Sequence, residues 1–186
     1  MPPEPLKRVI VSVTPSAEIE RTLSEPDPKV FSHLTPDGRL TMVDVGAKTA
    51  SERSATAAAV VVVSARTEAL LRERALPKGD ALVAAQVAGI LAAKRTAELV
   101  PLCHGLPLSS VDIAFSWRGP GRLEVRATAR TIAQTGVEME ALTAVSIAAL
   151  TIYDMVKGVE RGVTIERIRL LEKRGGKSGV WSAPEP

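Results

Sequence analysis

The chain has 186 residues, with 24 Lys and Arg against 21 Asp and Glu and a formal net charge of +3 at pH 7. This length fits one domain with a real core, and the nearly balanced charge argues only weakly for an anionic partner. The single cysteine, Cys103, excludes an internal disulfide, and the two histidines do not supply the ligand cluster of a structural zinc, so the composition suits a reducing cytoplasm.

The N-terminal residues are rich in Pro, Ser, Thr and charge and show no sustained period. We therefore expect a loosely ordered arm over residues 1–37 and a single domain over residues 38–182. Three prolines precede the first apolar run, unlike the continuous apolar stretch of a signal peptide. The longest apolar stretch, Ala141 to Tyr153, is far short of the roughly 20 residues that a membrane span requires, so we expect a soluble protein without a membrane partner.

The first predicted strand runs from Thr56 to Arg66, where an unbroken series of small and β-branched residues is typical of a strand covered on both faces. A short helix is predicted from Thr67 to Ala75. Asp80 is then a good N-cap for a long amphipathic helix that reaches about Glu98, ahead of the helix-stopping Pro101.

Two alternating segments, residues 109–117 and 122–130, flank the turn sequence RGPGR and predict a hairpin. Residues 139–158 predict a second long helix, apolar nearly all round, which is buried between layers or at a subunit contact. The last strand, Val163 to Leu171, loses its alternation at residues 166–167, which indicates a bulge. The order β-α-β-β-α-β, with an extra short helix, indicates the α+β class and a ferredoxin-like βαββαβ sandwich.

Asp154 and Lys157 lie three residues apart on one helix face, where a carboxylate and an ammonium group can pair or share protons. An ordinary ion pair near a helix C-terminus is the alternative interpretation. Glu140, Thr143 and Thr151 continue the same polar stripe on a helix that is otherwise apolar, and buried charges persist mainly when they pair or react. The pattern therefore favours a stripe that lines a cleft.

His104 lies in a loop between a helix end and a strand, where active sites are often built, although a hydrogen-bonded structural histidine fits the same pattern. Cys103 is flanked by Leu102 and Leu106. These apolar neighbours favour a packed, inert thiol over a nucleophile.

The sequence EKRGGKSG near the C-terminus is similar to a phosphate-binding loop, but Leu171 stands where a Walker motif needs glycine, and no helix follows. Its glycines can expose backbone N–H groups, and Lys173 and Lys177 add charge. A phosphate cradle of another geometry and a solvated basic tail both remain open. Lys78 precedes a helix N-terminus, which is a natural anion site, but it fits a solvated loop lysine equally well.

The two long helices set distances between these candidates. At 1.5 Å per residue, Glu140 and Asp154 are roughly 21 Å apart, and the helix after Asp80 separates Lys78 from His104 by roughly 27 Å or more. One small ligand cannot easily reach both ends within one chain. If all these residues serve one site, the economical solution is a symmetric oligomer in which a neighbour contributes its helix end.

The chain contains, in order, the segments MVDVGAKTASERSATA, LPKGD, AAKRTAELVPLCHGLPLS, TGVEMEALTAVSIAALTIYDMVKGV and LLEKRGGKSG. Over roughly Thr41 to Gly179 it resembles the molybdenum cofactor biosynthesis protein C family, the cyclic pyranopterin monophosphate synthases. The resemblance implies a ferredoxin-like fold and a hexamer built as a trimer of dimers, with sites at the dimer interfaces. The chain departs from the family at Gly105, where the family usually has proline and where glycine loosens the backbone.

The resemblance also implies the reaction. A lyase of this family converts (8S)-3',8-cyclo-7,8-dihydroguanosine 5'-triphosphate, which a radical enzyme makes from GTP, to cyclic pyranopterin monophosphate and pyrophosphate. No redox step is needed, and no cofactor is implied beyond a magnesium ion that the sequence leaves open as a companion of the phosphates.

By motif position, the resemblance implies that Asp154 and Lys157 perform general acid–base catalysis. It implies that substrate contacts come from two further groups of residues. Those that meet the base or pterin are Leu102, Cys103, His104, Glu138, Met139 and Glu140. Those that hold the triphosphate are Lys78, Lys173 and Lys177, with Arg53 as a further basic position.

Two other functions remain open on sequence alone: an RNA-binding or small-ligand-sensing ferredoxin-like module, and a catalytically silent homologue that serves as an assembly partner. RNA binding requires aromatic stacking residues, and the chain has one Tyr and two Phe, so we expect no nucleic-acid partner. The presence of all the motif residues, apart from the change at Gly105, argues against a silent homologue.

Overall fold

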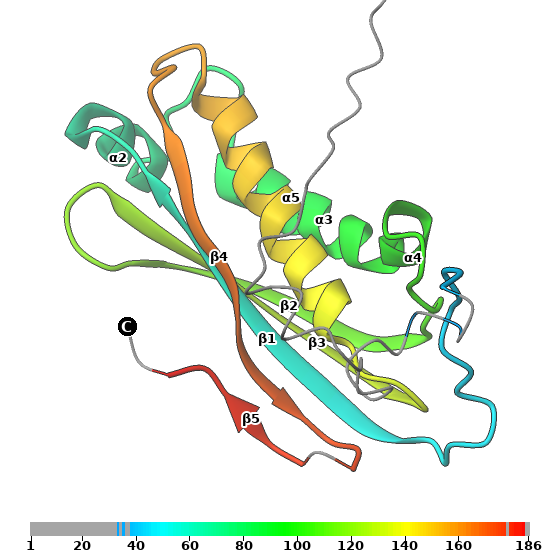
Figure 1. Cartoon of the computed structure of the whole chain (residues 1–186). Coiled ribbons are helices and arrows are strands. Elements are labelled where there is room, and N and C mark those ends of the chain that lie inside the picture. Colours follow the sequence, from blue (N-terminus) through cyan, green and yellow to red (C-terminus); the bar gives the residue numbers. More distant parts are fainter. Residues whose placement is uncertain (1–32, 34, 36–37, 178, 185–186) are drawn as a thin grey trace, which may run out of the picture. The chain divides into compact units, whose positions relative to one another are not determined.

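The computed structural model describes residues 33, 35, 38–177 and 179–184 (Figure 1). The arm expected over residues 1–37 therefore lies outside the described residues, except for His33 and Thr35. Residues up to Val43 form one unit and residues from Asp44 form a second, larger one. In the described part of the first unit, the Thr41 N–H donates to the His33 carbonyl at 2.9 Å.

The larger unit is built on one antiparallel sheet with the strand order β2-β3-β1-β4-β5. Its strands are β1 (Ser51–Val62), β2 (Leu108–Trp117), β3 (Arg122–Ala133), β4 (Thr164–Arg174) and β5 (Trp181–Ser182). The order of the first four strands is that of a ferredoxin-like sheet, which confirms the predicted α+β class. β5 was not predicted, because two residues are too short for a recognisable alternation.

The helices are α2 (Ala65–Arg72), α3 (Ala81–Lys94), α4 (Thr96–Leu99) and α5 (Glu138–Val156). α3 and α5 pack against each other on one face of the sheet (Figure 1). Gly89 allows this close approach, because a Cβ at that position would lie 2.8 Å from the Ala144 carbonyl oxygen and would overlap the Ile113 side chain.

The burial pattern of β1 shows that the helices cover one face of the sheet. Ala55, Ala57, Ala59 and Val61 alternate along the strand and are at most 1% exposed, because they face the helices. The prediction that the first strand is covered on both faces is wrong: in the part of the chain that the structure describes, no helix covers the other side, where small residues lie between long side chains of β3 and β4.

The chain departs from several predicted boundaries. β1 runs from Ser51 to Val62 instead of from Thr56 to Arg66, because Ser64 already caps α2. The expected helix to Glu98 breaks at Arg95 into α3 and α4, where the buried Thr96 hydroxyl donates to the Ala93 carbonyl at 3.0 Å. β4 continues three residues further than predicted, to Arg174. The bulge predicted in β4 is confirmed, because the register with β1 shifts between Ala58 and Val60 and Arg167 has a φ of 54°.

α5 is the core helix of this unit. Its length and composition alone would allow it to cross a membrane, with a mean hydropathy of 1.4. Eight of its residues are nevertheless buried within this chain against α3 and the sheet, as expected for the centre of a two-layer fold. The predicted burial is therefore confirmed for the face that meets α3 and the sheet, and the alternative of a subunit contact for the rest of the helix stays a prediction.

Candidate active site

Three charged side chains meet where α5 ends and α3 begins. Asp154 lies in the last turn of α5, Lys157 is the C-cap of that helix, and Lys78 lies in the loop before α3. Lys157 Nζ is 2.6 Å from Asp154 Oδ1, and Lys78 Nζ is 3.2 Å from Asp154 Oδ2. We call these three residues the acid–base cluster.

The electrostatics of the cluster follow from this geometry. Hydrogen bonds from Lys157 and Lys78 hold the pKa of Asp154 below its usual value. The hydrogen bond to Asp154 raises the pKa of Lys157. At neutral pH the cluster is therefore one carboxylate between two ammonium groups, with its side chains about half exposed. Two cations with one anion leave a net positive site that suits an anionic ligand.

Backbone geometry positions Lys78 in the cluster. Its ammonium group also donates to the Asp154 main-chain carbonyl at 2.8 Å, so it caps the end of α5 as well as pairing with the side chain. Asp80, two residues later, caps α3 by accepting from the N–H groups of Leu82 and Val83 at 3.0 and 3.2 Å. The short loop that holds Lys78 and Asp80 therefore stabilises both the start of α3 and the end of α5.

A second group of site candidates lies at the opposite end of α5. Lys173 Nζ on β4 is 3.1 Å from Glu138 Oε1, in the first turn of α5. Arg53 on β1 reaches two carbonyl groups at the end of β3, with its Nε and one terminal nitrogen at 3.4 Å from the oxygens of Ala133 and Gln134. With Lys177 and the intervening glycines, Arg53, Glu138 and Lys173 form what we call the loop cluster.

Gly175 and Gly176 shape this cluster. Both have positive φ, 99° and 74°, and a Cβ at Gly176 would overlap the Arg53 guanidinium. A Cβ at Gly175 would overlap the Glu52 carbonyl oxygen. The glycines thus let the chain turn back directly over Arg53, which explains why this loop is glycine-rich without being a Walker loop.

Two cavities open at the loop cluster. One, of about 210 Å³, is lined by Arg53, Ser54, Thr135, Gly136, Glu138, Lys173, Arg174 and Gly175. A larger one, of about 830 Å³, includes Arg53, Gly176, Lys177 and also Lys48. Sequence reasoning did not single out Lys48, although it stands in the quoted segment GAKTASERS. Only the fold reveals Lys48, because it lines the same cavity as two basic residues that are more than a hundred positions apart in the chain.

Glu140 and Cys103 lie close together next to this end of α5. Glu140 is 4% exposed, and burial raises its pKa, with the charge of Glu138 as a smaller contribution. Burial raises the pKa of the Cys103 thiol, and the Glu140 charge raises it further. A thiol with a raised pKa is a poor nucleophile, which agrees with the prediction of an inert Cys103.

The remaining candidates flank these two residues. Leu102 and His104 are half-buried beside Cys103, and Met139 is 38% exposed beside Glu140. The His104 ring has no hydrogen bond to any other described residue. Gly105 has no left-handed φ, and a Cβ there would meet nothing within 4 Å, so nothing in the local geometry requires glycine after His104.

The structure thus sorts the predicted residues into two groups rather than one site. The acid–base cluster lies at one end of α5, and the loop cluster lies with residues 102–104 and 138–140 at the other, roughly 21 Å away along the helix. Within the described ranges no group of three or more His, Cys, Asp or Glu side chains is placed to hold a metal ion. The two cavities described above open at the loop cluster, whereas Asp154, Lys157 and Lys78 lie at the opposite end of α5.

Comparison with known proteins gives a consistent set of relatives. The sequence profile of the MoaC family matches residues 42–176. The cyclic pyranopterin monophosphate synthase of Nitratidesulfovibrio vulgaris is 55% identical over 154 residues, which cover 82% of this chain and 96% of the relative. The synthase of Bordetella petrii is 54% identical over 160 residues, covering 86% and 98%, and that of Chloroflexus aggregans is 56% identical over 156 residues, covering 83% and 94%.

Proposed function

Because this chain belongs to the MoaC family, we propose that it converts (8S)-3',8-cyclo-7,8-dihydroguanosine 5'-triphosphate to cyclic pyranopterin monophosphate and pyrophosphate. The family and its curated relatives identify the chain as an enzyme of molybdenum cofactor biosynthesis. The observation that carries the finer proposal is Asp154, held between two lysine ammonium groups beside the end of α5. We further propose that a radical enzyme supplies the substrate from GTP and that the reaction takes place in the cytoplasm.

The products fix the bonds that change at phosphorus. A hydroxyl of the sugar-derived part attacks the α-phosphorus and closes the cyclic monophosphate, while the bond from the α-phosphorus to the bridging oxygen breaks and pyrophosphate leaves. The attacking hydroxyl gives up one proton and the ring rearrangement moves others, but no electron is gained or lost. The enzyme therefore needs proton donors, proton acceptors and cations for the leaving group.

Lys157 fits the proton donor. Its pKa is raised by Asp154, so it stays protonated at neutral pH and can protonate a ring nitrogen or oxygen as the ring opens. The lowered pKa of Asp154 makes this carboxylate a weak base while both lysines hold it. Its role is to fix the two ammonium groups and to accept a proton once substrate draws a lysine away.

Three basic residues are suited to bind the triphosphate: Lys173, Lys177 and Arg53. They are cations around cavities that the glycine turn leaves open, and positive charge there stabilises departing pyrophosphate. Magnesium, where it accompanies the phosphates, would be bound by phosphate oxygens, because the described residues offer no cluster of three potential protein ligands.

The buried side chains near Glu140 are suited to bind the nucleobase part of the substrate. A carboxyl group whose pKa is raised by burial keeps more of its proton than a solvated one and can donate a hydrogen bond to a ring atom. Half-buried His104 and Leu102 and the partly exposed Met139 surround the same end of α5. These residues would hold the base or pterin through polar and apolar contacts.

We propose that two chains build each site jointly, as dimers within a hexamer. The two groups of residues lie at opposite ends of one helix, so a single ligand can meet both only if a second copy brings its own end across. α3 offers a surface for that contact, because Val83, Val87 and Leu91 follow one another at intervals of four and are 51%, 53% and 49% exposed.

The proposal is tested by supplying purified protein with the product of the radical enzyme. We expect pyrophosphate release and, after oxidation, a fluorescent pterin. Asp154→Asn should lower the rate by roughly 100-fold or more, because it removes the charge that fixes both lysines. Asp112→Asn, at an exposed carboxylate on β2, is the matched control and should keep the wild-type rate. No product with the wild type, or full turnover in Asp154→Asn, would exclude the proposed reaction.

A further inference from the structure

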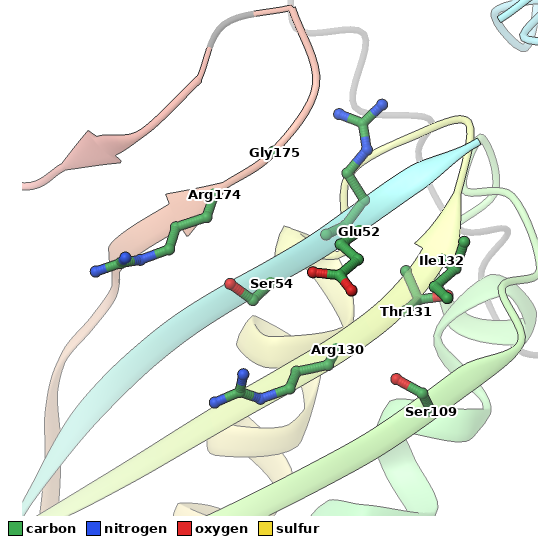
Figure 2. A pocket seen from close by; sticks show the side chains of 9 residues that line it. Glu52, Ser54, Ser109, Arg130, Thr131, Ile132, Arg174 and Gly175 are labelled. Atoms are coloured by element: carbon green, nitrogen blue, oxygen red, sulfur yellow. The ribbon is translucent and has the colours of Figure 1, made fainter. Parts of the chain in front are cut away.

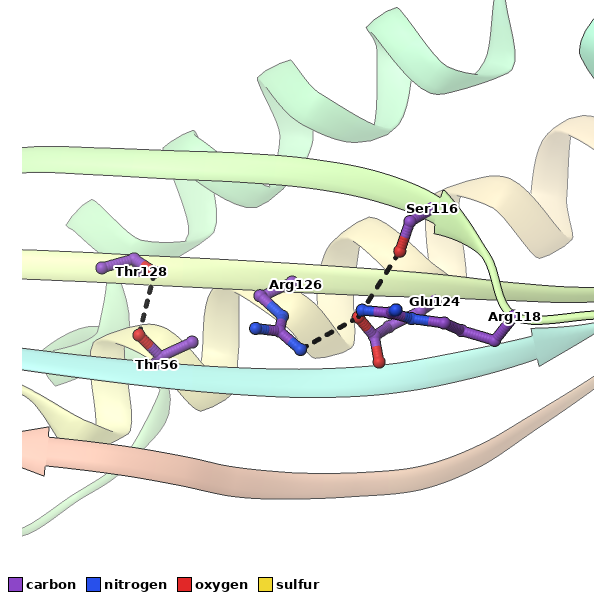
Figure 3. Close-up of polar contacts among 6 residues, drawn as sticks. All are labelled: Thr56, Ser116, Arg118, Glu124, Arg126 and Thr128. Atoms are coloured by element: carbon purple, nitrogen blue, oxygen red, sulfur yellow. Dashed lines mark hydrogen bonds and ion pairs between the residues drawn. The ribbon is translucent and has the colours of Figure 1, made fainter. Parts of the chain in front are cut away.

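The sheet face opposite α3 and α5 carries charged side chains that belong to the loop cluster or pair with one another. Its cavity of about 490 Å³ (Figure 2) shares four residues with the smaller cavity of the loop cluster: Arg53, Ser54, Arg174 and Gly175. Glu124 accepts from Arg118 at 2.8 Å and lies 3.2 Å from Arg126, so its charge is compensated within the sheet surface (Figure 3). A further carboxylate, that of Glu160, lies apart from both groups and bears on the other end of α5.

Glu160 follows α5 in the chain and binds the start of α2. Its two carboxylate oxygens accept from the Ser64 N–H at 3.2 and 3.0 Å, and one of them also accepts from the Ser64 hydroxyl at 2.8 Å. Ser64 is the N-cap of α2 and in turn accepts from the Thr67 N–H at 3.4 Å. In a capping box, a glutamate in the position of Thr67 would bind the N–H of the cap. Glu160, which is 96 positions away from Ser64, takes that part here.

The Glu160 carboxylate is half-buried and charged at neutral pH. Burial alone would raise its pKa, but hydrogen bonds from Thr67 and Ser64 outweigh this effect and hold the pKa below its usual value. A negative charge at the start of a helix also complements the helix dipole. The segment after α5 is therefore fastened to α2 by hydrogen bonds to a charged group, which are stronger than those between neutral groups.

The segment that Glu160 fastens also holds Lys157. The Lys157 N–H donates to the Tyr153 carbonyl at 2.9 Å, as the last residue bound into α5, and the Glu160 N–H donates to the Val156 carbonyl at 3.0 Å. The Tyr153 hydroxyl lies 3.4 Å from the Arg161 carbonyl oxygen, to which it donates. Helix ends fray where their last groups are not held. The contact of Glu160 with α2 therefore limits the motion of the turn that begins at Lys157.

The same contact bears on Lys78, which lies after α2. Leu76 is 6% exposed and anchors the loop that follows α2, and the Gly79 N–H donates to the Leu76 carbonyl at 3.0 Å around Lys78. The Lys78 ammonium group then reaches the carbonyl and the carboxylate of Asp154. The contacts form a closed ring: Glu160 joins the end of α5 to the start of α2, and Lys78 joins the loop after α2 to the end of α5.

We propose that Glu160 is a positioning residue for the acid–base cluster. By fastening the segment after α5 to α2, it holds the ammonium groups of Lys157 and Lys78 at the Asp154 carboxylate. It acts through the backbone of both segments and not on the reacting atoms. Its effect on turnover rests on the proposed function, whereas its effect on the geometry of Lys157 can be measured without turnover.

The test compares kcat and KM of Glu160→Ala and wild type from about pH 7 to pH 10, around the ordinary pKa of lysine. We expect kcat to fall about 10-fold or more, since misplaced catalytic groups cost at least that much. KM should change less than about twofold, because the residues proposed to bind the triphosphate and the base lie at the other end of α5.

The pH profile distinguishes positioning from a general loss of stability. Lys157 must be protonated to donate, so kcat falls as the pH rises through its pKa, which the contact with Asp154 raises. A weaker contact in Glu160→Ala lowers that pKa, and the basic limb of the profile should move to lower pH. An unshifted limb in Glu160→Ala overturns the proposal.

Glu68→Ala is the matched control. Glu68 lies on the same helix and accepts from the Gly121 N–H at 2.7 Å, which fastens α2 to the turn between β2 and β3 instead. This variant should lose stability while kcat and KM stay within about twofold and the basic limb stays in place. An equal fall of kcat in Glu68→Ala and Glu160→Ala overturns the proposal. Glu160→Gln keeps one acceptor oxygen and should show smaller changes of the same sign; where Glu160→Ala fails to fold, a wild-type profile in Glu160→Gln overturns it.

A titration of Lys157 separates this inference from the proposed function. In protein with isotope-labelled lysine, the Lys157 side-chain resonance, assigned by its loss in Lys157→Arg, should titrate at lower pH in Glu160→Ala than in wild type or Glu68→Ala. If the wild type has no turnover but this shift occurs, the proposed reaction fails and the positioning by Glu160 stands. If the wild type turns over and the shift is absent, the positioning role fails and the proposed reaction stands.

Discussion

Glu140 is the one charged side chain that is buried in the described part of the chain. Burial raises its pKa, so the folded protein binds this proton more tightly than the unfolded chain does. The resulting stability is present at acid pH and is lost as the pH rises through the raised pKa. A glutamate is kept here at a cost in stability, which is typical of residues that contact a ligand.

Replacing Glu140 with Gln removes the cost of burying a charge. We expect the melting temperature of Glu140→Gln, relative to wild type, to rise between pH 5 and pH 8, by about 2–4 °C for each kcal/mol of charging cost removed. Thermal unfolding at the two pH values measures this, and activity should fall in the same variant. A melting-temperature difference that is the same at both pH values would show that Glu140 carries no charge-burial cost.

Cys103 illustrates how a neighbouring charge changes reactivity. Burial and the Glu140 charge both raise the pKa of its thiol, so the thiolate is scarce at neutral pH. We expect Cys103→Ala to keep most of the wild-type rate and alkylation by iodoacetamide at pH 7 to be slower than that of a free thiol. Loss of turnover in Cys103→Ala, without loss of folding, would mean that the thiol takes part in the chemistry.

At the scale of elements, the start of α3 depends on the cap at Asp80. Its carboxylate accepts from two backbone N–H groups that have no partner within the helix. We expect Asp80→Ala to lower the free energy of unfolding by about 1 kcal/mol, measured from the urea midpoint, and Asp80→Ser to restore most of it because serine is also a good cap. Because Lys78 lies two residues before the cap, turnover should fall with stability in Asp80→Ala and recover in Asp80→Ser. An alanine variant as stable as wild type would contradict the role of the cap.

The elements show what the sequence can predict. Alternation and capping signals predicted the hairpin, the Asp80 cap, the core helix and the bulge in β4, because each depends on residues near one another in the chain. The break at Arg95 was missed, since Thr96 bends the helix through a hydrogen bond that periodicity does not reveal. The open face of β1 was also missed, because small residues suggest burial between layers even where flanking long side chains shield them.

The candidate site was predictable only where its contacts join residues that are near one another in the chain. The spacing of Asp154 and Lys157 on a helix is local and predicts their contact, at 2.6 Å in the structure. The contact of Lys78 with Asp154, and of Glu138 with Lys173, depends on how α3 and β4 dock on α5, which no local pattern specifies. Lys48 was missed because it joins Arg53 and Lys177 only through the folded sheet.

At the scale of the whole molecule, the rigid length of α5 decides what one chain can do. In the proposed function its two ends hold complementary halves of a site, with proton-transfer groups at one end and phosphate- and base-binding groups at the other. A helix of this length cannot bring its own ends together, whereas a two-fold related copy can place its far end beside the near end of the first. Each dimer would then contain two equal sites, each with one half from each chain.

Mixing inactive variants measures this arrangement directly. Asp154→Asn damages the acid–base cluster and Lys173→Ala damages the loop cluster, so a mixed dimer has one doubly damaged site and one intact site. An equal mixture, after exchange of chains, should recover about a quarter of the wild-type rate, because half of the dimers are mixed and half of their sites are intact. Mixing Lys78→Ala with Asp154→Asn should recover nothing, since these residues pair at 3.2 Å within one chain and every site then lacks one of them. Recovery by that second mixture, or none by the first, would mean that the site is not divided between chains in this way.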